Sequence, residues 1–74
     1  MIFTTTSGSI YEINYEHNVF RKLNGDGIWH EYANVVSDVA VGHSFQALLR
    51  ELDENGLARS FHTTPVVSVS EGLN

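Results

Sequence analysis

Residues 45–69, FQALLRELDENGLARSFHTTPVVSV, decide the fold of this chain. The turn-forming run DENG at 53–56 divides the stretch into two arms, and Gly56 suits the positive φ of a hairpin bulge. This turn sets apolar side chains opposite apolar ones and an acid opposite a base. The expected pairs are Leu52 with Ala58, Glu51 with Arg59, and Leu49 with Phe61. We therefore predict a long β-hairpin that continues into a final strand.

The first arm also fits a helix. Its apolar residues recur at i, i+3, i+4 and i+7, and they are Phe45, Leu48, Leu49 and Leu52. Ser44 is a usable N-cap and Gly56 a usable terminator. The partner run 57–63 has no such stripe, and the hairpin register is coherent on both faces. We favour the strand, with an α+β fold containing one helix at about residues 44–52 as the alternative.

Two shorter hairpins are expected in the N-terminal half. The first turns on Ser7 and Gly8 as a two-residue loop. The second turns on 16–18, with Asn18 in the left-handed conformation that Asn tolerates. These loops place Ile2 opposite Ile13, Thr4 opposite Tyr11, Tyr15 opposite Val19, Ile13 opposite Arg21, Tyr11 opposite Leu23, and Glu12 opposite Lys22.

This register predicts one largely apolar inner face. Its members are Ile2, Tyr11, Ile13, Tyr15, Val19 and Leu23. Phe3, Ile10 and Phe20 then fall on the opposite face, which is not cleanly polar. A sheet that curls into a barrel explains this pattern, because bends and bulges at its corners interrupt simple alternation.

The remainder of the chain reads as further strands. The run NGDG at 24–27 is a strong turn signal, and a strand is expected at 28–33. Residues 34–42 predict an irregular crossover with one short strand at most. Pro65 cannot donate to a β-ladder and marks a corner or an edge, after which 66–69 forms the last strand.

Composition indicates one domain over residues 1–74. Nine Asp and Glu residues against four Lys and Arg residues give a net charge of −5, which opposes binding to nucleic-acid phosphates and to anionic membranes. Cysteine is absent, so disulfides and thiolate metal sites are excluded. No targeting segment and no apolar run of membrane-spanning length is visible. We expect a cytoplasmic protein.

Motifs for chemistry are weak. The four histidines (His17, His30, His43 and His62) stand singly, without the spacing that presets two imidazoles toward one ion. No Gly-x-Ser-x-Gly elbow is present, and the NGDG run lacks the Lys-Ser/Thr of a phosphate cradle. A chain of this length also has little room for a pocket of roughly 300 Å³. We expect no enzyme, metal, cofactor or small-molecule substrate.

Three aromatic residues are the candidate partner-binding residues, namely Trp29, Tyr32 and Phe20. Burial in the core is the commoner fate of such side chains, because a small domain needs them to fold. The functional interpretation is that Trp29, on the face that carries Glu31, is exposed as a binding anchor, since Trp and Tyr dominate interface hot spots.

The opening IFTTTSGSIYEI and the closing RSFHTTPVVSV resemble the two ends of small uncharacterised β-rich proteins from actinobacteria and their phages. Thr64 replaces a Ser that is usual in the closing motif of that group. The resemblance implies a phage or prophage setting and a strand at 45–52. It assigns no functional residue.

The expected architecture is all-β, with five to seven short antiparallel strands in a small barrel of SH3-like or related type. The expected function is that of an accessory protein that binds a host or phage protein without catalysis. Two alternatives are a self-associating structural component of a virion and a small barrel that binds nucleic acid through Trp29 and Tyr32.

Overall fold

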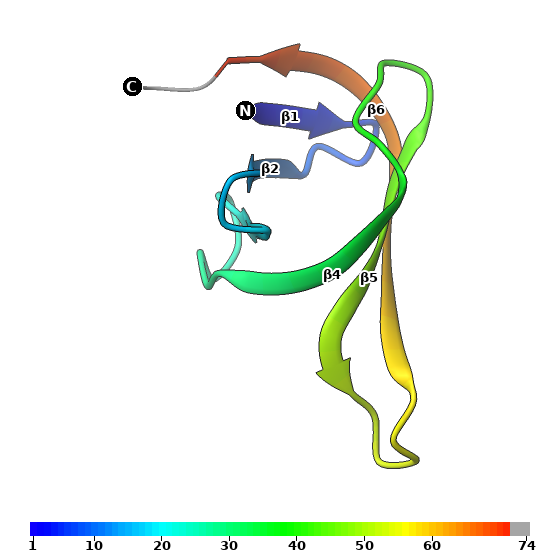
Figure 1. Ribbon diagram of the computed structural model, residues 1–74. Coiled ribbons are helices and arrows are strands. Elements are labelled where there is room, and N and C mark those ends of the chain that lie inside the picture. The colour runs from blue at the N-terminus through cyan, green and yellow to red at the C-terminus, as the bar shows by residue number, and fades with distance from the viewer. Residues whose placement is uncertain (72–74) are drawn as a thin grey trace.

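The computed structural model describes residues 1–71 and shows a closed barrel of six antiparallel strands, paired in chain order (Figure 1). The strands are β1 Ile2–Thr5, β2 Ile10–Asn14, β3 Val19–Lys22, β4 His30–Ser37, β5 Ser44–Leu52 and β6 Ala58–Ser70. No helix occurs within these 71 residues, and hence none there that is long and apolar enough to cross a membrane. The predicted all-β barrel is confirmed.

The hairpin of β5 and β6 confirms the strand interpretation of residues 45–52, and the helix alternative is wrong. Its turn closes where the DENG run predicts, with Gly56 at a φ of 78°. The Asp53 carboxylate accepts the backbone N–H groups of Asn55 at 2.8 Å and Leu57 at 3.0 Å. This local bonding is the reason that Asp favours turns.

The register of this hairpin is correct only next to the turn. Leu52 pairs with Ala58 as predicted, but the register shifts between Leu48 and Leu52. Phe61 therefore pairs with Ala47, and the prediction that it pairs with Leu49 is wrong. A bulge lets two facing strands carry different numbers of residues, and alternation alone does not reveal it.

The first hairpin is shifted by one residue from the prediction. The Thr5 N–H donates to the Ser9 carbonyl at 2.9 Å, so three residues form the loop instead of two, with Gly8 at a φ of 85°. Phe3 consequently pairs with Tyr11. The predicted pairs of Ile2 with Ile13 and of Thr4 with Tyr11 are wrong.

The second hairpin is also shifted by one residue. Its loop has four residues, 15–18, and Asn18 adopts the predicted left-handed conformation at a φ of 54°. Ile13 pairs with Phe20. The other partners in this register are Tyr11 with Lys22, Glu12 with Arg21, and Asn14 with Val19, so the four pairs predicted here are wrong.

These two corrections bring the large aromatic residues to the interior. Direct partners in an antiparallel pair point to the same face, so Phe3 and Phe20 join Tyr11 and Ile13 inside. The buried apolar core comprises Phe3, Tyr11, Ile13, Phe20, Tyr32, Phe45, Ala47 and Val66. Four residues predicted for the inner face lie outside this core, namely Ile2, Tyr15, Val19 and Leu23.

The later strands differ in length from the prediction. β4 begins at His30 and continues to Ser37, so the expected crossover over 34–42 is wrong for its first residues. β6 is one strand of 13 residues that pairs with β5 as far as Pro65 and with β1 from Val66 onward. Pro65 thus marks the point where β6 changes partner, and β6 curves around the barrel between its two halves (Figure 1).

Candidate functional site

The barrel is open at one end, where the hairpin of β5 and β6 extends beyond its neighbours (Figure 1). β1 pairs with β6 only from Val66 onward, so the first half of β6, residues 58–64, has β5 as its one strand partner within residues 1–71. β3 and β4 also pair over a short length, through Val19 with Glu31 and Phe20 with His30.

A cleft occupies this opening. It consists of two adjoining hollows of about 210 and 310 Å³ that share Phe20, His30 and Phe61. The first is also lined by Tyr11, Lys22 and Asp26, and the second by Leu49, Glu51, Arg59 and Ser60. The expectation that the chain has little room for a hollow of this size is wrong.

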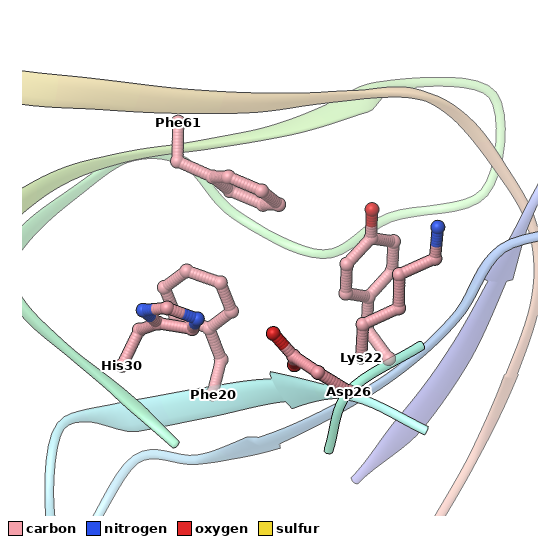
Figure 2. Close-up of a pocket in the computed structure, with 6 residues that line it drawn as sticks. Phe20, Lys22, Asp26, His30 and Phe61 are labelled. Carbon is pink, nitrogen blue, oxygen red and sulfur yellow. The ribbon is translucent and has the colours of Figure 1, made fainter. Parts of the chain in front are cut away.

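The floor of the cleft is aromatic. The rings of Phe20 and Phe61 lie 4.6 Å apart between centroids, and the His30 ring lies 5.6 Å from that of Phe20. Tyr11 meets Phe61 edge-on at 5.7 Å. Figure 2 shows the Phe20 and Phe61 side chains pointing toward one another from different strands, with His30 beside Phe20. Phe45 contacts both phenylalanines from the core, so the floor is an outward continuation of the core.

The rim of the cleft carries charges of both signs. The Glu51 carboxylate lies 3.4 Å from Nδ1 of His30, and the Asp26 carboxylate accepts the Ile28 N–H at 3.0 Å. Lys22 and Arg59 are exposed, and neither forms an ion pair with any residue of the described chain. The acidic groups of the rim are therefore already hydrogen-bonded, whereas its two permanent cations are not paired.

Glu51 and Arg59, which the sequence predicted to lie opposite each other, both line the cleft, but the Glu51 carboxylate contacts His30 instead of Arg59.

The cleft also follows the edge of β6. Arg59, Ser60 and Phe61 are successive residues of this strand, and all three line the second hollow. Successive side chains of a strand point to opposite faces, so a cavity that contacts three in a row extends along the strand edge.

The three candidate residues predicted from the sequence do not form one surface. Phe20 and Tyr32 are each 3% exposed, and their rings pack at 6.4 Å within the core. Phe20 reaches the cleft only through the floor. Trp29 is 43% exposed and lies elsewhere, beneath the Arg21 guanidinium, whose carbon is 4.4 Å from the ring centroid.

Arg21 connects Trp29 to β2. Its guanidinium lies 2.7 Å from the Glu12 carboxylate, so one arginine bridges an acid and an indole on the outer face of the sheet. The predicted cross-strand ion pair of Glu12 therefore exists with a different partner, since Lys22 was the residue expected. One face of the Trp29 ring is covered by this contact.

Other titratable groups bear on the fold more than on chemistry. The Tyr15 hydroxyl donates to the Asp38 carboxylate at 2.5 Å, and burial, together with this acceptor, raises the pKa of Tyr15 well above its ordinary value. Burial likewise raises the pKa of Tyr32. Within residues 1–71, no group of three His, Cys, Asp or Glu residues is placed to hold a metal ion.

Comparison of the chain with protein-family models, with curated proteins and with solved structures gives no match. Of the residues that line the cleft, only Phe20 was a candidate from the sequence; those missed include Lys22, His30, Arg59 and Phe61, which come from three strands. The one signal available in the sequence was that Arg59 and Phe61 alternate on one face of a predicted strand. The correct register of the other strands was needed to place Lys22 and His30 beside them.

Proposed function

We propose that this protein is a non-enzymatic binding module that holds a segment of another protein in the cleft at the barrel mouth. The observation that carries this proposal is the aromatic floor of Phe20, Phe61 and His30, which reaches solvent between hydrogen-bonded strands. Aromatic side chains in a concave, partly desolvated site are typical anchors of protein interfaces.

The charges of the cleft support a protein partner over a nucleic acid. The chain carries a net charge of −5, which repels a phosphate backbone at long range. Within the cleft, Lys22 and Arg59 balance Asp26 and Glu51, so a segment of moderate charge is not repelled. Tyr32 is buried and offers no stacking surface beside Trp29, which weakens the nucleic-acid alternative.

The proposed setting is the cytoplasm of a host cell, with a host or phage protein as the partner. This setting follows from the resemblance of the two chain ends to phage and actinobacterial proteins. Binding without catalysis is the role that the cleft supports best, because its acidic groups serve in local hydrogen bonds to His30 and to the Ile28 N–H.

Site-specific photo-cross-linking tests the binding role. A photoreactive residue is introduced at Ser60, which lines the cleft, and separately at Ser68, an exposed serine on the other half of β6. In an extract of the native host, we expect a discrete protein adduct from position 60 and none from position 68. Absence of an adduct at position 60, or equal adducts at both positions, contradicts the proposal.

Self-association is the second candidate function, and the tip of the long hairpin favours it. Leu52 and Leu57 flank the turn and are each 64% exposed, so two large apolar side chains lie in solvent at the tip. Assembly through this tip would suit a structural component of a virion. A strictly monomeric mass by light scattering at high protein concentration contradicts this candidate.

A further inference from the structure

We infer that the cleft takes an extended peptide that is both acidic and apolar, and that this peptide adds as a strand to the open edge of β6. This inference rests on the proposed binding function and specifies the chemistry of the partner. Three features carry it: the strand edge, the unpaired cations and the aromatic floor.

The open edge supplies the main-chain contacts. Residues 58–64 pair with β5 on one side, and their other side has no strand partner within residues 1–71. Such an edge presents N–H and C=O groups that an extended peptide can bind in register. At the far end of the segment, the Thr64 hydroxyl accepts the Ser7 N–H at 3.3 Å and donates to the Ser7 hydroxyl at 3.1 Å, and just beyond it the Pro65 carbonyl accepts the Thr6 N–H at 2.9 Å.

The cations supply the charge selection. Lys22 and Arg59 are two of the four Lys and Arg residues of the chain, and both line the cleft. Neither forms an ion pair with another of the described residues. The two acids that also line the cleft have other contacts: the Glu51 carboxylate lies 3.4 Å from Nδ1 of His30, and the Asp26 carboxylate accepts the Ile28 N–H at 3.0 Å. A carboxylate on the incoming peptide can therefore pair with cations that form no ion pair among the described residues.

The floor selects an apolar side chain. Every second residue of an added strand faces the same way, so alternate side chains of the peptide point into the cleft above Phe20 and Phe61. Figure 2 places Lys22 at one end of the first hollow and His30 at the other. An aromatic or aliphatic residue at the floor, with an acidic residue two positions away, matches this arrangement.

A single-stranded nucleic acid could also combine stacking with anion contacts, but the structure favours the peptide. The Phe20 and Phe61 rings already lie 4.6 Å apart, which leaves no gap for a base between them. The edge of β6 presents both N–H donors and C=O acceptors at the spacing of a strand. A phosphodiester backbone has no donors that could bind these C=O groups. The negative charge of the chain adds a further penalty.

Selection from a displayed library of short random peptides tests the inference on the intact protein. We expect enriched peptides to combine acidic with aromatic or aliphatic residues. The chemical-shift changes of this protein's backbone amides on addition of a selected peptide are then measured by NMR. The largest changes should lie at residues 58–62 and around Phe20. The variants Lys22→Glu and Arg59→Glu should each weaken binding about tenfold, and added salt should weaken it further.

The variant Arg50→Glu is the matched control. It makes the same charge change on an exposed arginine of β5 that does not line the cleft, and it should leave affinity within about twofold. Methylation of single backbone nitrogens in the selected peptide tests strand addition. Alternate positions should lose more than about tenfold in affinity, because only every second N–H of an edge strand faces its neighbour.

Each outcome decides a separate point. This inference is wrong if the peptides that bind in the cleft lack acidic residues, if they bind both charge-reversal variants as tightly as the parent, or if every methylated peptide still binds. Each of these results leaves the proposed binding function intact. An oligothymidylate that binds the same residues more tightly than any selected peptide overturns this inference in favour of nucleic acid. No enriched peptide, with a cross-link at position 60 still present, overturns the extended-peptide class alone. No peptide and no cross-link overturn both proposals.

Discussion

The Tyr15 hydroxyl donates a 2.5 Å hydrogen bond to the Asp38 carboxylate, 23 residues further along the chain. This bond joins the turn between β2 and β3 to the segment that follows β4. It matters because β3 and β4 share only two residue pairs, Val19 with Glu31 and Phe20 with His30. The side-chain bond strengthens the weakest seam of the barrel.

Tyr15→Phe should therefore lower the free energy of unfolding by about 1 kcal/mol, the usual net contribution of one hydrogen bond. Urea denaturation measures this change. Asp38→Asn is the control, since its amide oxygen can still accept from Tyr15 and from the Val39 N–H. A Tyr15→Phe protein as stable as the parent would show that the bond adds nothing in water.

The same hydroxyl predicts an alkaline loss of stability. Partial desolvation of the hydroxyl, on a side chain that is 41% exposed, and then the Asp38 acceptor raise the pKa of Tyr15 above its ordinary value of 10.0. The folded state thus holds the phenolic proton more tightly than the unfolded state. The contribution of this proton to the free energy of unfolding is fully present below pH 10 and is lost as the pH rises above it. Urea midpoints measured on both sides of pH 10 should show a shallower fall for Tyr15→Phe, and an identical fall would refute the assignment.

Arg21→Ala should expose the indole of Trp29. The guanidinium covers one ring face at 4.4 Å and pairs with Glu12 at 2.7 Å. Trp29 fluorescence should shift to the red, while the free energy of unfolding falls by less than about 1 kcal/mol, because these groups are partly exposed. Arg21→Lys, which keeps the charge but not the planar group, should give an intermediate shift. An unchanged emission spectrum in Arg21→Ala contradicts the stacked geometry.

Thr63→Val should destabilise the protein although the two side chains have nearly the same shape. The buried Thr63 hydroxyl accepts the Phe45 N–H at 3.1 Å and donates to the Thr64 carbonyl at 2.7 Å. Valine leaves that buried N–H without a partner, which costs about 1–3 kcal/mol. Thr63→Ser retains both bonds and loses only a methyl group, about 0.8 kcal/mol. Thermal unfolding compares the melting temperatures of the two variants. A Thr63→Val protein that melts at the same temperature as the parent would contradict this prediction.

Gly56→Ala should weaken the turn of the long hairpin. Gly56 has a φ of 78°, and an L-residue with a side chain pays about 1–2 kcal/mol in this region. A new Cβ meets no atom within 4 Å, so the folded state is strained through its backbone and not by a steric clash. Gly56→Asn should cost less, because Asn tolerates the left-handed conformation. Denaturant unfolding compares the two, and equal losses would point to a cause other than φ.

Sequence reasoning predicted the strands of this barrel better than their pairing. The DENG turn and the hairpin of β5 and β6 follow from local chemistry, as does the left-handed Asn18. Loop lengths do not, and each of the first two loops is one residue longer than expected. A one-residue slip moves a strand's apolar set to the other face, which is why Phe3 and Phe20 were misplaced.

The candidate site was harder to predict for the same reason. The sequence left open whether Trp29 and Tyr32 are core or exposed, with burial as the commoner fate; in the structure Trp29 is 43% exposed and Tyr32 is a core residue. Phe61 and His30 meet in the cleft because strands remote in sequence bring them together, and no local motif marks either residue. Strand order and register are the information that the sequence pattern lacked.

The pairing of β1 with the second half of β6 also bears on synthesis. Thr5 must wait for Val66 before the barrel can close, since these residues are paired in the finished sheet. At 5–20 residues per second, a ribosome takes roughly 3–12 s to supply the intervening chain. During that interval the edge of β1 is available to other strands, so the nascent chain should depend on chaperones or on rapid hairpin formation more than its small size suggests.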